Sequence, residues 1–234
     1  MKEQGFSDDA FAFKLFRSYE PREYCVQYGE TYLHFISRLT EEEGIYFYFE
    51  HSRGSHRLCF CDREGGPPIS GEAGLRYIQG TGQVADTATI NRIRLHHEVN
   101  SNAATYRDWN FTKPKLSLHV EEKADPAGAP VPQGMKLEQY RYPHLYQLRA
   151  EGSRYAKLQT TRQLNFSRWI ELSSDVSRFL PSYTFSVYEH DRDDINAKWW
   201  VFSVQHQGSQ PGVLGHEAPG PGIAINPPSP PFLK

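Results

Sequence analysis

The sequence predicts an α+β protein that is mainly β, with a strand–helix–hairpin subdomain followed by a curled sheet or small β-barrel that carries one helix. Aromatic residues make up 14% of the 234 residues, and Tyr-rich stretches favour pleated, half-buried surfaces. Segments of alternating polarity recur along much of the chain, which indicates strands. Two other stretches have the apolar spacing of a helix instead.

The first group of predicted elements lies near the N-terminus. Residues 23–28 (EYCVQY) alternate in polarity and predict a strand. Thr31 then supplies the N-cap of a helix whose apolar residues recur at i, i+3, i+4 and i+7, and Gly44 supplies the left-handed position that ends it. Residues 45–51 and 57–62 predict the two strands of a β-hairpin.

Most of the remaining predicted elements are strands. A second helix is expected over residues 149–164, with Tyr155, Leu158 and Arg162 along one stripe. Residues 122–134 are rich in Pro, Gly and Ala and predict a flexible loop. The predicted strands cover residues 89–99, 105–111, 115–121, 166–172, 182–189 and 198–206.

These elements divide the chain into four regions. The first is the strand–helix–hairpin subdomain (1–64), which a connector (65–88) joins to the barrel-like subdomain (89–206). The last is a Pro/Gly-rich tail (207–234) without a sustained pattern, which we expect to be flexible.

Composition argues against several classes of protein. The formal net charge is −2 and the basic residues are spread evenly, so a nucleic-acid-binding surface is not expected. No apolar run has the ~20 residues needed to cross a bilayer, and the N-terminus does not resemble a secretory signal, which predicts a soluble protein made in the cytoplasm. Three cysteines do not suit a disulfide framework, and we expect reduced, buried thiols.

The acidic triplet Glu41, Glu42 and Glu43 is the strongest cluster of titratable side chains. Adjacent residues splay around a helix, so they do not flank one bond as the paired acids of a glycosidase do. They also stand at the helix C-terminus, where the macrodipole disfavours carboxylates. Two interpretations remain open: a solvated helix end in which Glu42 pairs with Arg38, or a contact with a basic patch on another domain or subunit.

The ten histidines and the acidic run at residues 191–196 (DRDDIN) do not predict a metal site. His96 and His97 point to opposite faces of a straight strand, and no acidic or cysteine ligand completes a site with His51 and His56. The acidic run lacks the glycine of a calcium loop and predicts a polar hairpin turn. No nucleophile motif or phosphate-binding loop is present either, so we expect no catalytic residues and no cofactor.

Residues 22–62 carry a resemblance to a known family. The string from REYCVQY through LHFISRL and EEEGIYFYFEH to HRLCFCD resembles the tail-hub region of the valine–glycine-repeat spike proteins of type VI secretion, and of the late-control D hub proteins of contractile phage tails. The similarity continues through WNFTKP, RYPHLY, GSRYAKLQ and VFSVQHQG, and covers roughly residues 3–208. Two positions depart from the family pattern, because His144 and Ser182 stand where glycine is usual.

The resemblance implies a tail-hub fold and a homotrimeric hub without catalysis in this region. Such a trimer would match the hexameric tube protein beneath it and carry a spike above, with baseplate components, spike-tip proteins and effectors as partners. It would assemble in the cytoplasm and leave through the injection machine, or form part of a phage tail. Neither nucleic acid binding nor stable membrane insertion is implied. The predicted subunit contacts are the acidic triplet and one face of the strand at residues 89–99, namely Arg92, Arg94 and His96.

Three further expectations accompany this interpretation. Compared with the family pattern, the chain resembles a fragment or a truncated member, and we expect it to be monomeric or weakly associating by itself. A carbohydrate- or protein-binding module is an alternative, resting on aromatic-rich strands such as that of Trp199 and Trp200. A cell-wall hydrolase that uses Glu43 is a weaker one.

Overall fold

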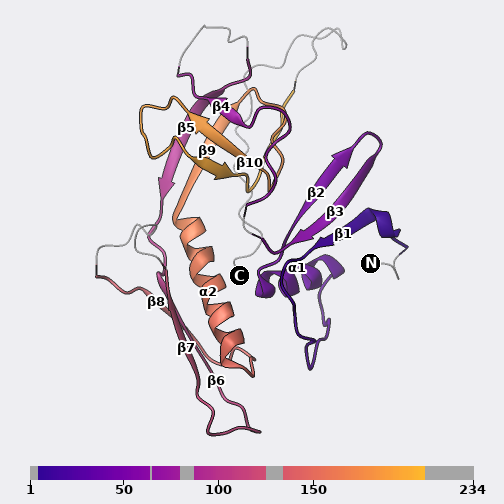
Figure 1. Ribbon diagram of the computed structural model, residues 1–234, viewed down its shortest axis with the longest axis vertical. Coiled ribbons are helices and arrows are strands. Elements are labelled where there is room, and N and C mark those ends of the chain that lie inside the picture. Colours follow the sequence, from indigo (N-terminus) through magenta and orange to yellow (C-terminus); the bar gives the residue numbers. More distant parts are fainter. Residues whose placement is uncertain (1–4, 64, 80–86, 125–133, 209–234) are drawn as a thin grey trace. The chain divides into compact units, whose positions relative to one another are not determined.

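The computed structural model describes residues 5–63, 65–79, 87–124 and 134–208. The chain divides into two compact units, residues 1–203 and residues 204–234, and all the elements below belong to the first. The described residues are mainly β with two α-helices, as predicted (Figure 1). Most of the predicted loop at 122–134 and nearly all of the predicted tail at 207–234 lie outside the described residues.

Three strands form the first sheet, in the order β1–β3–β2. The predicted hairpin is confirmed, because β2 (Tyr46–Ser52) pairs antiparallel with β3 (Ser55–Cys61). The third strand, β1 (Phe11–Lys14), was not predicted and lies parallel to β3, after the short 3-10 helix η2 (Asp8–Ala10). The strand predicted over residues 23–28 is wrong, because this exposed segment pairs with no sheet.

The two faces of this first sheet differ. On one face, Tyr48, Cys59 and Cys61 are buried and pack against partly buried neighbours that include Tyr183. The other face is apolar but partly open: Phe13 stacks on the buried ring of Phe60 at a centroid distance of 5.2 Å, and Phe13 is 63% exposed. The hairpin is therefore anchored through its tyrosine–cysteine face.

The helix α1 (Tyr32–Glu43) begins and ends where the sequence predicts. The Thr31 hydroxyl accepts a hydrogen bond from the backbone N–H of His34 at 3.2 Å, which caps the first turn. Gly44 adopts φ 71°, and its N–H bonds the carbonyl of Glu41 at 3.1 Å. These local signals are strong enough to set the helix bounds.

The helix α2 (Arg149–Ser167) lies along the sheet β7–β6–β8 and extends three residues beyond its predicted end (Figure 1). Its buried residues include Gly152, Ala156 and Thr160, a stripe of small side chains at i, i+4, i+8. A Cβ on Gly152 would lie 2.5 Å from Cε2 of Tyr146, so the close packing of α2 on this ring, which belongs to the segment before the helix, requires glycine there. The sheet consists of β6 (Ala103–Asp108), β7 (Leu118–Lys123) and β8 (Glu138–Arg141).

The remaining strands form two further sheets, and no closed barrel is present among the described residues. In the first, β5 (Ile90–His97) pairs antiparallel with β9 (Arg168–Ser174). In the second, β10 (Thr184–Tyr188) lies between β11 (Lys198–Trp200) and β4 (Gly74–Arg76), which comes from the predicted connector. The described strands therefore form four separate sheets rather than one that closes onto itself, because each sheet ends in edge strands that pair with a single neighbour.

Candidate functional site

The acidic triplet at the end of α1, here called the helix-end cluster (Glu41, Glu42 and Glu43), is the main predicted site. The structure brings all three carboxylates against arginines that are distant in the sequence. The ion pairs, measured between nitrogen and oxygen, are Glu41 with Arg162 at 2.7 Å, Glu42 with Arg22 at 2.6 Å, and Glu43 with Arg22 at 2.9 Å and Arg154 at 2.6 Å. The cluster therefore joins α1 to α2 within this chain.

Glu43 is the most enclosed member of the helix-end cluster, with a side chain that is 16% exposed. Its Oε1 also accepts a hydrogen bond from the Tyr155 hydroxyl at 3.2 Å. The Arg154 guanidinium lies over the Tyr155 ring at 4.4 Å from its centroid, a cation–π arrangement. Burial and then the charge of Glu43 raise the pKa of Tyr155, so its hydroxyl stays a proton donor to this carboxylate at neutral pH.

Glycine at the end of α1 lets the two helices approach each other. A Cβ on Gly44 would lie 2.5 Å from Cδ2 of Leu158, which is a residue of α2. Tyr155, Leu158 and Arg162, the stripe predicted for α2, therefore face the end of α1, while smaller side chains face the sheet. The three arginines neutralise carboxylates that the helix macrodipole disfavours at this end.

One of the two interpretations of the acidic triplet is corrected here. Glu42 does not pair with Arg38, because Arg38 Nη2 binds Glu30 Oε1 at 2.7 Å and Glu42 binds Arg22. Spacing along the helix favoured the local pair, but Glu30 precedes the helix and reaches the same arginine. A contact of the triplet with another subunit stays a prediction.

The second predicted surface is the face of β5 that carries Arg92, Arg94 and His96. Arg94 Nη1 lies 3.3 Å from Oε2 of Glu171 on β9. The His96 ring stacks on the Trp169 ring with centroids 3.8 Å apart and planes at 1°. Its Nε2 is buried and lies 3.7 Å from Glu171 Oε2, which is too far for a hydrogen bond.

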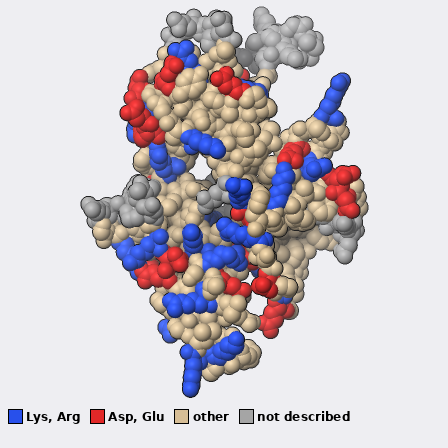
Figure 2. All heavy atoms as spheres, in the orientation of Figure 1, with Lys and Arg blue, Asp and Glu red and all other residues tan. Residues whose placement is uncertain are grey.

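This β5 face also bounds a shallow hollow of about 210 Å³ with Glu171, Leu172 and Ser173. The structure thus brings Arg92 and Arg94 together beside one carboxylate, and holds His96 flat against an indole. On the side of the molecule drawn in Figure 2, Lys and Arg side chains are interspersed with Asp and Glu side chains. With Arg92, Arg94 and Glu171, the face offers an ion-pairing partner charges of both signs.

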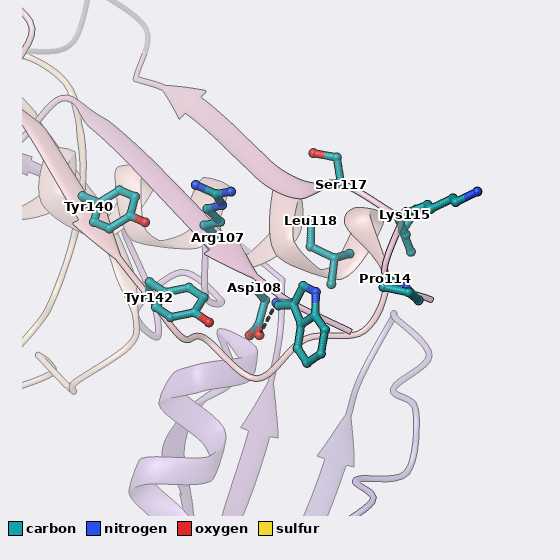
Figure 3. A pocket seen from close by; sticks show the side chains of 10 residues that line it. Arg107, Asp108, Pro114, Lys115, Ser117, Leu118, Tyr140 and Tyr142 are labelled. Atoms are coloured by element: carbon teal, nitrogen blue, oxygen red, sulfur yellow. Dashed lines mark hydrogen bonds between the residues drawn. The ribbon is translucent and has the colours of Figure 1, made fainter. Parts of the chain in front are cut away.

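A larger pocket, which the sequence analysis did not identify, lies at the end of β6 and has a volume of about 460 Å³ (Figure 3). Aromatic side chains from separate segments line it: Trp109 after β6, Tyr140 on β8 and Tyr142 just beyond. Their exposed fractions are 58%, 58% and 56%. The motifs WNFTKP and RYPHLY contain Trp109 and Tyr142, but no sequence signal places them together.

Asp108 fixes the wall of this pocket. Its Oδ1 accepts a hydrogen bond from the N–H of Trp109 at 2.7 Å, and its Oδ2 accepts from the N–H groups of His144 at 3.0 Å and Tyr146 at 3.3 Å. The carboxylate is therefore occupied by the backbone. It serves as a clamp between two chain segments.

The chemistry of other predicted residues follows from their surroundings. Cys59 and Cys61 are buried as predicted, but Cys25 is exposed because its segment forms no strand, so its predicted burial is wrong. The Trp199 indole N–H donates to the carbonyl of Ile195 at 3.0 Å.

The described residues contain no group of three His, Cys, Asp or Glu side chains that suits a metal ion. In the same part of the chain, neither helix is long and apolar enough to cross a membrane.

Comparisons with known proteins identify relatives along most of the chain. Residues 2–212 match the family model of the phage tail baseplate hub (GPD). The chain is 36% identical over 214 residues to the type VI secretion system spike protein VgrG4b of Pseudomonas aeruginosa, covering 92% of this chain and 26% of that protein. It is 33% identical over 211 residues to VgrG5 of the same organism, covering 90% and 26%.

The chain therefore spans about a quarter of the length of these two curated relatives. A solved structure, the tail protein from Neisseria meningitidis, has a similar fold with a TM-score of 0.54 at 14% identity. That match covers 82% of this chain and 55% of the tail protein.

Proposed function

The chain belongs to the phage tail baseplate hub (GPD) family, and on this premise we propose that it is a structural hub component of a contractile injection machine such as the base of a type VI secretion spike. The observation that carries the proposal is the family match over residues 2–212. The similarity to two spike proteins of type VI secretion and the shared fold of a tail protein support it. In this function the region acts through its contact surfaces and performs no catalysis.

We further propose that the whole protein assembles as a homotrimer between a hexameric tube and a spike. A three-fold ring uses a heterologous interface, in which two different faces of each protomer meet. The β5 face is our candidate for one of them, because Arg92 is exposed and Arg94 and Glu171 keep more than half of their side-chain surface open. The helix-end cluster is a weaker candidate, since each of its carboxylates already has an arginine partner.

The partners and location follow from the same proposal. Tube, baseplate, spike-tip and effector proteins would contact the trimer, which would assemble in the cytoplasm and leave through the machine or remain in a phage tail. The hydrolase and carbohydrate-binding alternatives gain no support from the site. Glu43 is held by Arg22, Arg154 and Tyr155, and the Trp199 indole by Ile195 and Arg168, so neither is presented to a ligand. Trp200 is 40% exposed, and its ring packs edge-on against Tyr46 with centroids 5.5 Å apart.

The experiment is chemical crosslinking with light scattering on a version of the protein that carries the complete hub and spike. We expect a trimer, and we expect Arg94→Glu to weaken it because the substitution reverses a charge that the β5 face would offer to a neighbouring protomer. Arg53→Glu, in the exposed turn of the first hairpin, is the control with the same change of charge. A monomer at all concentrations, together with normal secretion after deletion of the gene, would contradict the hub function.

A further inference from the structure

The pocket at the end of β6 adjoins the edge of a sheet. Among the described residues β8 pairs only with β6, in the order β7–β6–β8, so its other side presents backbone N–H and C=O groups without a strand partner. An edge of this kind takes up extended peptides by forming main-chain hydrogen bonds. A bound segment would thus lie directly beside the side chains that β8 contributes to the pocket.

The register of the sheet places these side chains on one face. Tyr140 is opposite Thr105 on β6, and residues two apart on a strand share a face, so Tyr140, Tyr142 and Arg107 project from the side of the sheet away from α2. The opposite face carries Tyr106, which is buried in the cluster that includes Ala156 of α2. The three pocket side chains therefore lie on the opposite side of the sheet from the helix–sheet core, which reaches the pocket through Leu118.

The charge of the pocket is positive. Arg107 and Lys115 line it, both are exposed, and neither forms an ion pair with another described residue. The carboxylate in the wall, Asp108, is engaged by three backbone N–H groups. Figure 3 shows Tyr140 and Tyr142 on one side of the pocket and Pro114 and Lys115 on the other, so the pocket offers both rings and a cation to the side chains of a bound segment.

We propose that this pocket and the edge of β8 form a docking site for an extended acidic peptide segment of a partner protein. Main-chain hydrogen bonds to β8 would hold the segment, while its acidic side chains pair with Arg107 and Lys115 and its apolar side chains pack on Trp109, Tyr140 and Tyr142. A segment whose pocket-facing side chains, at every second position, are in turn acidic and apolar suits this arrangement, because an added strand presents every second side chain to the pocket. The site goes beyond the proposed hub function and does not require the trimer.

The test uses the full chain and a fluorescent, capped hexapeptide of sequence Glu-Thr-Phe-Thr-Glu-Thr, whose glutamates and phenylalanine share one face of an extended strand. We expect saturable binding by fluorescence anisotropy, and about tenfold or more weakening when lysine replaces glutamate or when alternate peptide nitrogens are methylated. Arg107→Gln with Lys115→Gln, and separately Tyr142→Ala, are each expected to weaken binding by about tenfold. Arg141→Gln is the matched control, because Arg141 is exposed but points to the other face of the sheet, and it should leave the affinity unchanged.

Each other outcome overturns the proposal. Absence of saturable binding, equal affinity for the lysine peptide, or no effect of methylation would each exclude an acidic strand at this edge. A dimer in analytical ultracentrifugation that dissociates on Tyr142→Ala would show that a second copy of the chain occupies the site instead. Circular dichroism of each variant, and Tyr142→Phe as a variant that keeps the ring, separate loss of the site from loss of the fold.

Discussion

Glu43 Oε2 lies 2.6 Å from Arg154 Nη2, and this ion pair joins the last turn of α1 to α2 across 111 positions of sequence. Glu43 is 16% exposed and Arg154 29%, so both charges are largely withdrawn from water. Removing one partner of such a pair leaves the other charge without compensation, which costs more than the pair contributes when intact. The relationship identifies Glu43 as a structural residue of the helix junction.

Glu43→Gln is therefore expected to destabilise the chain by about 1–3 kcal/mol, because Arg154 and Arg22 lose their shared carboxylate. Glu41→Gln is the matched control. The side chain of Glu41 is 45% exposed and that of its partner Arg162 is 41% exposed. Ion pairs this exposed contribute about 0–1 kcal/mol to the free energy of unfolding. Urea unfolding followed by circular dichroism measures both variants. Equal effects of the two substitutions would show that enclosure of Glu43 has no energetic consequence.

Gly44→Ala tests the approach of the helix end to α2. We expect a loss of about 1–2 kcal/mol from the left-handed φ of 71°, and a further loss because the new Cβ meets Leu158. Gly29→Ala is the control for the first effect alone, since Gly29 has φ 62° and a Cβ there meets no atom within 4 Å.

The second effect is isolated by combining Gly44→Ala with Leu158→Ala. If the clash is real, the double variant is more stable than the sum of the two single losses predicts, and thermal unfolding of the four chains measures this coupling. Strict additivity would mean that the Leu158 side chain moves aside without cost.

Local signals determined which parts of the fold the sequence predicts. Thr31 and Gly44 fix α1 through contacts within a few residues, and the hairpin follows from turn residues between two alternating segments. The strand expected at residues 23–28 fails because alternation describes two faces but does not supply a pairing partner. Instead β1 pairs with β3 from more than forty positions away, a relationship without a local pattern.

The helix α2 shows a second limit. Its large apolar residues suggested a stripe through Tyr155 and Leu158, but the face against the sheet consists of small residues such as Gly152 and Ala156. Small side chains carry little hydrophobic signal although they allow the closest packing. Distance along the sequence sets a further limit. The acidic triplet was predicted, but its arginine partners were not, because they are far from it in the sequence. The aromatic pocket was missed because its side chains come from separate segments.

Ser182→Gly is expected to stabilise the chain by about 0.5–1 kcal/mol. Ser182 has φ 69°, a left-handed conformation that costs a side-chain-bearing residue more than glycine. It follows Pro181 in a turn closed by the hydrogen bond from Tyr183 N–H to the Leu180 carbonyl at 3.2 Å, the arrangement in which glycine is favoured at this position. Differential scanning calorimetry should show a higher Tm. Ser182→Ala, which keeps the Cβ, should show no gain, and a gain of equal size would rule out backbone strain.

His144 is expected to make stability depend on pH. Its half-buried ring stacks on Tyr106 at 4.2 Å and on Tyr155 at 5.2 Å between ring centroids. Burial lowers the pKa of this imidazole in the folded chain. Below pH of about 6.5 the unfolded chain therefore binds more protons than the folded chain, and the free energy of unfolding falls as the pH decreases, until the folded imidazole is protonated as well.

His144→Phe keeps an aromatic ring against Tyr106 and Tyr155 but cannot take up a proton. The free energy of unfolding of this variant should therefore decline less than that of the parent chain between about pH 7 and pH 5, while the two chains keep a constant difference above about pH 7. Urea unfolding at a series of pH values measures this. His119→Gln, at an exposed position on β7, is the control, because it removes an imidazole without changing the ring that packs on Tyr106 and Tyr155. If the parent and His144→Phe curves run parallel across the whole range, titration of His144 does not contribute to stability.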